Sequence, residues 1–164
     1  MIKNRWIKKS YILPFIAVSI STSMAAEAKS NREEWHSFHS TYRVEERHGQ
    51  AFMMFENPPL FKSGDKPYVV IHPRKTHPLC ENGQFSGVHN YRELIVNGQS
   101  VQYGKECLGS VMHYYPINEY GMNYLISEFI ESQSVEIIDG GTTLNFSAMG
   151  FLRSYREKYG EPKL

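Results

Sequence analysis

Two histidines in the first third of the chain have a spacing that suits metal binding. His36 and His39 are three positions apart, and in a helix this spacing puts two side chains on one face. Imidazole is a common zinc ligand, but a zinc site needs at least three protein ligands. The spacing of the remaining His, Cys, Asp and Glu residues nominates no third ligand. We therefore expect no metal site and no cofactor, and His36 and His39 are the first pair to substitute as a test.

The segment around Pro73 concentrates cationic and titratable side chains. It contains His72, Arg74, Lys75 and His77. The group follows an apolar run that predicts a strand, and loops at strand ends often carry binding residues. This pattern indicates a loop that binds an anionic group or an acidic partner. The alternative is a solvated loop with ordinary turn-forming prolines.

Motifs for catalysis are absent from the sequence. The chain has no nucleophile elbow, no zinc-protease pair and no glycine-rich nucleotide loop. Carboxylate pairs that cleave glycosides have no fixed local spacing, so Glu45, Glu46, Glu56 and Glu81 are neither excluded nor favoured as catalytic groups. We expect a protein that is not an enzyme, and an envelope hydrolase is an alternative.

Strand and turn patterns predict the elements that position these residues. Residues 91–96 and 99–103 flank Asn97-Gly98, a pair that readily takes the positive φ values of a hairpin turn. A second hairpin is predicted around Asp139-Gly140-Gly141, between residues 135–138 and 142–146. Short apolar runs predict three further strands, at residues 51–55, 67–72 and 108–115.

Apolar periodicity predicts two helices near the end of the chain. Between Asn118 and Gln133 the apolar residues recur at helical spacing. A final helix is predicted from a cap at Ser147 to a stop at Gly160.

Two segments have weaker patterns. Trp35, Phe38 and Tyr42 suit one face of a short helix, and a strand from Ser40 is the alternative. Residues 73–90 predict a long loop. The expected class is α+β, with a mainly antiparallel sheet built from hairpins, one amphipathic helix before the last hairpin and one C-terminal helix.

The beginning of the sequence has the pattern of an export signal. Four cations fall in the first nine residues, and an apolar run at residues 11–20 and small residues follow. The run is too short for a permanent membrane span, which needs about 20 apolar residues. We expect a signal peptide at residues 1–25, with residue 28 as the alternative end, and one exported domain at 26–164. Cleavage after residue 25 changes the net charge from +1 to −3, which argues against nucleic-acid binding.

The predicted export affects the expected oxidation state of the two cysteines. Cys80 and Cys107 are the two cysteines of the chain, and an oxidising compartment favours their pairing. We therefore predict a Cys80–Cys107 disulfide. A reactive thiol is less consistent with the sequence, because neither cysteine has the usual neighbours of such a thiol.

The end of the chain resembles a known bacterial family. Residues 134–138, followed by Leu144-Asn-Phe-Ser-Ala-Met-Gly-Phe-Leu152, are similar to the closing strand and helix of the invasion-associated locus B family of envelope proteins. The similarity covers about a fifth of the chain. It implies a β-rich periplasmic or secreted protein that takes part in host or envelope interaction, and it implies no catalytic residues. Having only two cysteines departs from the family pattern.

These observations predict an exported bacterial envelope protein that acts by binding another protein. The partner would be an envelope, host or toxin protein, in an invasion, exclusion or immunity role. The expected location is periplasmic or secreted, without a permanent membrane span after signal cleavage. The second hypothesis is a small-ligand or metal-binding periplasmic protein that uses the histidine-rich loop.

Overall fold

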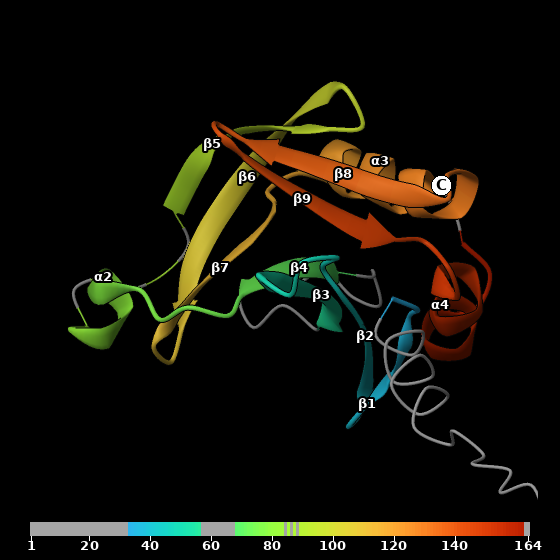
Figure 1. Cartoon of the computed structure of the whole chain (residues 1–164), viewed down its shortest axis with the longest axis horizontal. Helices are drawn as coiled ribbons and strands as arrows, with labels where there is room; N and C mark the ends of the chain where they lie inside the picture. Colours follow the sequence, from blue (N-terminus) through green and yellow to red (C-terminus); the bar gives the residue numbers. More distant parts are fainter. Residues whose placement is uncertain (1–32, 57–67, 84, 86, 88, 163–164) are drawn as a thin grey trace, which may run out of the picture.

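A curled antiparallel sheet with the two longer helices at one end and a short helix at the other forms the described part of the chain (Figure 1). The computed structural model describes residues 33–56, 68–83, 85, 87 and 89–162, so the predicted signal peptide lies outside it. Within this part, the strands are β1 (His36–Phe38), β2 (Thr41–Glu45), β3 (Ala51–Glu56), β4 (Tyr68–Pro73), β5 (His89–Val96), β6 (Gln99–Leu108), β7 (Val111–Pro116), β8 (Ser134–Asp139) and β9 (Thr142–Ser147). The helices are α2 (Pro78–Glu81), α3 (Glu119–Glu131) and α4 (Phe151–Tyr159). The predicted α+β class is confirmed.

Both predicted hairpins are present. β5 and β6 pair antiparallel across Asn97 and Gly98, whose φ values of 44° and 89° are those that the Asn-Gly turn favours. β8 and β9 pair from Ser134 opposite Ser147 to Asp139 opposite Thr142. These turns form where predicted because a two-residue hairpin depends on local backbone preference.

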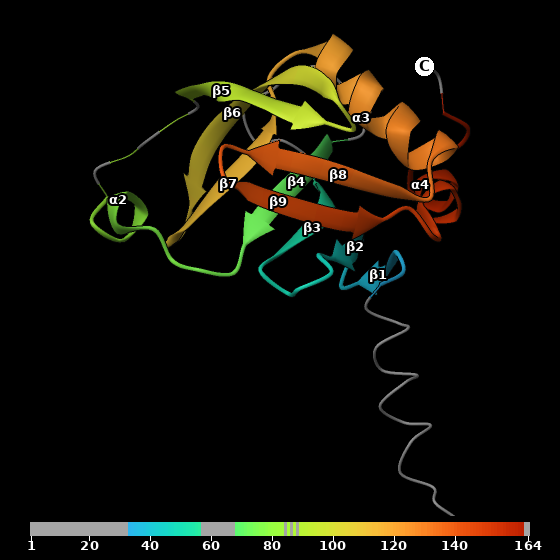
Figure 2. The ribbon, with the colours of Figure 1, turned by 45° about the horizontal axis from the view of Figure 1, so that its top comes forward.

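The sheet curls until its two ends meet. The strand order is β1-β2-β3-β4-β7-β6-β5-β8-β9, and all paired neighbours are antiparallel. Just after β2, Glu46 forms an isolated bridge with Phe146 of β9, and the Arg47 amide donates to the Asn145 carbonyl at 3.0 Å. Figure 2 shows β8 and β9 crossing over β2 to β4. The curl thus brings the β2–β3 turn close to β9, about 100 residues away in sequence.

The core fills the inside of the curl. Alternate residues of the strands point inward, and α3 packs against β4, β7, β8 and α4. Trp35 lies between β3 and both long helices, where its ring stacks on Phe55 at 4.8 Å and meets Phe129 and Phe151 edge-on at 5.4 and 5.0 Å. The helices therefore close the end of the curl where β8 begins.

Three local predictions need adjustment. The ambiguous segment is extended: Thr41–Glu45 is a strand, which is the strand alternative, and His36–Phe38 is a further strand that was not predicted. The prediction that Ser147 caps the last helix is wrong, because Ser147 ends β9 and Gly150, at φ 79°, stands at the N-cap of α4. Leu108 ends β6, so the strand predicted from that residue begins later, at Val111.

The predicted disulfide is formed in the structure. Cys80 lies in the short helix α2 and Cys107 in β6, with their Cα atoms 5.4 Å apart. The bond ties the segment predicted as a long loop to the β6–β7 hairpin. In the chain-entropy model, closing a loop of this length stabilises the fold by ~3–4 kcal/mol.

Among the helices of the described residues, none is long and apolar enough to span a membrane.

Candidate functional site

The four residues of the predicted binding loop lie in three separate places in the structure. His72 is buried in β4, where its ring stacks on Phe52 at 4.8 Å and lies 3.9 Å from the ring of His113. His77 caps α2, because its Nδ1 accepts the Leu79 amide. Neither histidine lines the cavities described below.

Arg74 and Lys75 do reach a cavity. Both follow directly after β4 and have exposed side chains. Arg74 stands between two adjoining cavities and borders both, together with Gly49 of the β2–β3 turn. Two of the four residues of the predicted binding loop therefore border a cavity.

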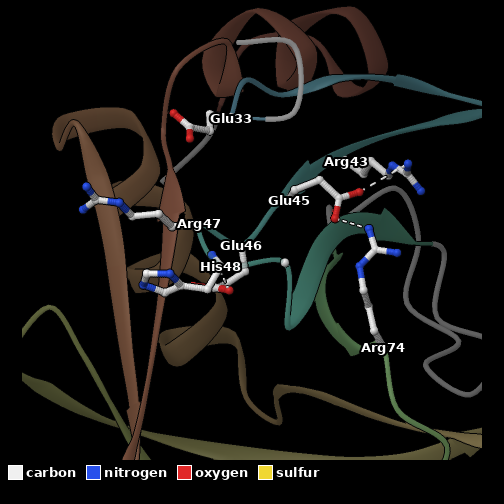
Figure 3. Close-up of a pocket in the computed structure, with 8 residues that line it drawn as sticks. Glu33, Arg43, Glu45, Glu46, Arg47, His48 and Arg74 are labelled. Atoms are coloured by element: carbon white, nitrogen blue, oxygen red, sulfur yellow. Dashed lines mark hydrogen bonds and ion pairs between the residues drawn. The ribbon is translucent and has the colours of Figure 1, made fainter. Parts of the chain in front are cut away.

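The first cavity has a volume of about 530 Å³ and is lined by charged side chains (Figure 3). At its centre lies Glu45, the last residue of β2, which is 5% exposed. Its carboxylate forms one ion pair with Arg43 at 3.3 Å and another with Arg74. The Arg43 guanidinium also lies over the Phe38 ring, 3.7 Å from its centroid. Glu45 therefore fixes both arginines in place and offsets one of their two positive charges.

Glu46 is the other carboxylate at this cavity, and it is 2% exposed. Its Oε2 accepts the backbone amides of His48 at 2.8 Å and Gln50 at 3.2 Å, and its Oε1 accepts the amide of Asn145 at 3.5 Å. These bonds compensate for burial of the charge. Glu46 thus holds the β2–β3 turn in shape and joins it to β9.

The carboxylates of Glu45 and Glu46 both bind groups of the protein itself. A general acid or base needs a carboxyl group that can exchange a proton with a bound substrate. Glu45 is held by two guanidinium groups, and Glu46 by three backbone amides. Of the other carboxylates considered from the sequence, Glu81 is exposed in α2, and the side chain of Glu56 lies outside the described part. The geometry therefore favours a structural role for Glu45 and Glu46.

The second cavity has a volume of about 470 Å³ and is mainly apolar. It opens at the end of the curl where the β2–β3 turn, the end of β4 and the β8–β9 turn converge, away from α3. Its walls are Ala51, Ile71, Leu94, Tyr114, Ile137 and Leu144. Its rim carries Gln50, Arg74, Lys75, Asp139 and Thr142. Apolar walls with a few polar groups at the opening are typical of small-molecule sites.

Two of the three charges at this rim have partners. Arg74 pairs with Glu45, and Asp139 pairs with Arg92 and accepts the Tyr91 hydroxyl at 3.0 Å. Lys75 has no ion-pair partner within the described part of the chain. Lys75 is therefore the rim charge that has no ion-pair partner among the described residues.

A phenol forms part of the wall of this cavity. Burial, together with the nearby Tyr91 and Asp139, raises the pKa of Tyr114 above its ordinary value. Its hydroxyl therefore stays protonated at neutral pH and can donate or accept a hydrogen bond.

The candidate metal pair lies elsewhere. His36 is in β1, where its Nδ1 bonds to the Glu34 carbonyl at 2.8 Å, and His39 is in the β1–β2 turn at φ 53°. The two are thus on a strand and a turn rather than on one helix face. In the described ranges, no group of three or more His, Cys, Asp or Glu could hold a metal ion.

Sequence reasoning missed the walls of the apolar cavity. Ile71, Leu94 and Ile137 are inward-facing strand residues whose pattern is that of ordinary core positions. Only the curl of the sheet leaves space between them at this end. Arg74 and Lys75 at the end of a strand were the one signal that pointed to the site.

Comparison of the chain with protein-family models, curated proteins and solved structures gives no match. The resemblance to the invasion-associated locus B family therefore stays a prediction.

Proposed function

We propose that this chain is an exported, non-catalytic binding protein that holds a small, largely apolar molecule in the cavity at the β8–β9 end of the sheet. The observation that carries the proposal is the cavity itself, about 470 Å³ between Ile71, Leu94, Ile137 and Leu144. Small-molecule sites occupy roughly 300–1,000 Å³ and have mostly apolar walls. The predicted export signal and the disulfide support a periplasmic or secreted location.

The position of the cavity also favours binding. No residue of α3 or α4 lines the cavity, whose polar rim comes from the β2–β3 turn, the segment after β4 and the β8–β9 hairpin. A ligand can enter between turns without displacing a helix. The sequence also predicted a small-ligand site, in the histidine-rich loop. The proposed site keeps Arg74 and Lys75 of that loop, but apolar side chains rather than histidines form its walls.

Filling the cavity should abolish ligand binding. Leu144 is half-buried in β9 and lines the cavity. We expect Leu144→Trp to lower the affinity for phenylnaphthylamine, a neutral fluorescent dye, by more than tenfold, because the larger ring occupies the space of the dye. The measurement is fluorescence titration of the purified protein.

The matched control is Thr143→Trp. Thr143 is exposed, and adjacent strand residues point to opposite faces, so this variant adds the same ring outside the cavity. It should bind the dye as the wild type does, and thermal unfolding should show that both variants are folded. If the wild type does not bind the dye, or if Leu144→Trp binds it as well as Thr143→Trp does, the proposal is wrong.

Protein binding, the first hypothesis from the sequence, is a second candidate function. The observation that favours it lies at the disulfide. Leu79 precedes Cys80 and Leu108 follows Cys107, and these two leucines are 38% and 56% exposed. An exposed apolar patch can mark a contact surface, and the disulfide holds the segments that carry these two leucines together.

This surface can be tested by comparing capture from periplasmic extract. A specific partner should be retained by the wild type and by Tyr120→Ser, which removes an exposed aromatic ring from α3. Leu108→Ser should lose that partner, because the apolar contact is removed. Equal capture by both variants, or no specific partner, would count against the second candidate.

A further inference from the structure

We infer that the ligand of the apolar cavity is a single-chain amphiphile with one carboxylate, whose chain lies inside the cavity and whose head group pairs with Lys75. The inference rests on the proposed function and names its ligand class. It follows from the charges at the rim, from the direction in which polarity changes along β4, and from the charge of the chain as a whole.

Charge complementarity selects the head group. Arg74 and Asp139 border the cavity with opposite charges, but each already has a partner: Arg74 pairs with Glu45, which it shares with Arg43, and Asp139 pairs with Arg92. A ligand charge near either one would have to compete with an ion pair that is already in place. Lys75 has no such pair in the described residues. One anionic group is therefore what the rim lacks.

The strand that leads to Lys75 sets the orientation of the ligand. Ile71 in β4 is 2% exposed and forms the wall, whereas Lys75, four residues further on, is exposed at the opening. Four residues of extended chain span at most about 13 Å. A molecule that contacts both must therefore be apolar at its inner end and charged at its outer end. Tyr114 and Gln50 add hydrogen-bonding groups between these ends.

Net charge does not explain attraction of an anion to this site. Without residues 1–25, the chain has 14 Lys and Arg against 17 Asp and Glu. Long-range attraction of anions by the whole molecule is therefore absent. Selectivity for a carboxylate would have to arise at Lys75 itself, and removal of this one side chain tests it.

The experiment measures competition against bound phenylnaphthylamine by decanoate, decanol and decyltrimethylammonium, all below the concentrations at which they aggregate. These three probes share one alkyl chain and differ in head-group charge. We expect decanoate to compete about fivefold better than decanol, the size of one exposed charge pair. Decyltrimethylammonium should compete less well than decanol.

Substitutions of Lys75 test whether this residue causes the preference for decanoate over decanol. Lys75→Gln should make decanoate and decanol equal, whereas Lys75→Arg should keep the preference because it keeps the charge. Arg156→Gln removes one positive charge from the exposed face of α4 and should leave the preference unchanged. Added salt should weaken the preference of the wild type, because the pair is solvent-exposed.

The outcomes separate the two proposals. If the dye binds and Leu144→Trp abolishes its binding, but decanoate and decanol compete equally or Lys75→Gln keeps the preference, the carboxylate inference is wrong and the cavity remains a ligand site. If the dye does not bind the wild type, or if Leu144→Trp leaves its binding unchanged, the proposed function fails and the inference fails with it.

Discussion

Replacing Trp35 with alanine should lower the free energy of unfolding by about 3–5 kcal/mol, the range for removing a large aromatic ring from a core. Trp35 is fully buried and contacts Phe55 of β3, Phe129 of α3 and Phe151 of α4. Its backbone amide also donates to the Met149 carbonyl at 2.9 Å. One side chain thus joins the sheet to both long helices, and the hole left by alanine would be bordered by three aromatic rings that cannot all shift to fill it.

The measurement is denaturation in urea followed by circular dichroism. Tryptophan fluorescence is unsuitable, because Trp6 is the only other tryptophan and lies in the predicted signal peptide. The midpoint of unfolding gives the loss of stability if the dependence on urea concentration is unchanged.

Trp35→Phe is the matched variant. The indole Nε1 is buried and has no hydrogen-bond partner among the described residues, so phenylalanine keeps an aromatic ring and removes an unpaired donor. Its loss of stability should be about 1 kcal/mol, well below that of alanine. If the two variants lose equal stability, the aromatic cluster does not hold the helices to the sheet.

The fold was predictable where short segments decide the structure. Asn97-Gly98 and Asp139-Gly140 set their own turns, and the apolar periodicity before Gln133 marks α3 without reference to the rest of the chain. The capping of α4 was predicted wrongly because Ser147 is a strong cap by itself but is held in β9. It pairs there with Ser134, and the amide of the next residue, Ala148, donates to the Gln133 carbonyl.

Contacts between distant segments were not predictable. Glu46 meets the Asn145 amide and Phe146 of β9 only because the whole sheet curls. In the sequence, Glu45 and Glu46 are two acids before a turn, with nothing to indicate that one joins two arginines and the other caps that turn. The cavity depends on the same curl, so its apolar walls had the pattern of core residues, and only its cationic rim could be located.

Raising the pH from about 10 to 12 should unfold the protein. Burial raises the pKa of Tyr68 from its ordinary value of 10.0 to about 12, and burial does the same for Tyr159. Burial also raises the pKa of Tyr103, which lies entirely inside the core. In the unfolded chain these hydroxyl groups ionise near their ordinary pKa, so the folded state holds their protons more tightly.

The sign and size of the effect follow from this difference. The stability contributed by a raised tyrosine pKa is fully present below pH 10 and is lost as the pH rises through the folded-state pKa. A difference between 10 and about 12 corresponds to at most ~3 kcal/mol for each tyrosine, and because both side chains are partly exposed, screening by solvent reduces this to about 1–2 kcal/mol. Two such groups, together with the fully buried Tyr103, remove a large share of the ~5–15 kcal/mol that stabilises a typical domain. Urea denaturation at several pH values between about 9 and 12 measures the decline.

Replacing Tyr68 measures how much of the loss of stability at high pH is due to this tyrosine. The Tyr68 hydroxyl donates to the Pro116 carbonyl at 3.3 Å, so Tyr68→Phe should lower stability at neutral pH by about 1 kcal/mol. Phenylalanine cannot ionise, so stability should then decline less steeply above pH 10, and the wild type should lose its advantage of about 1 kcal/mol and become less stable than the variant at high pH. Tyr120→Phe, at a position 68% exposed on α3, should decline as steeply as the wild type does. An unchanged slope in Tyr68→Phe would show that burial of this hydroxyl does not couple its ionisation to folding.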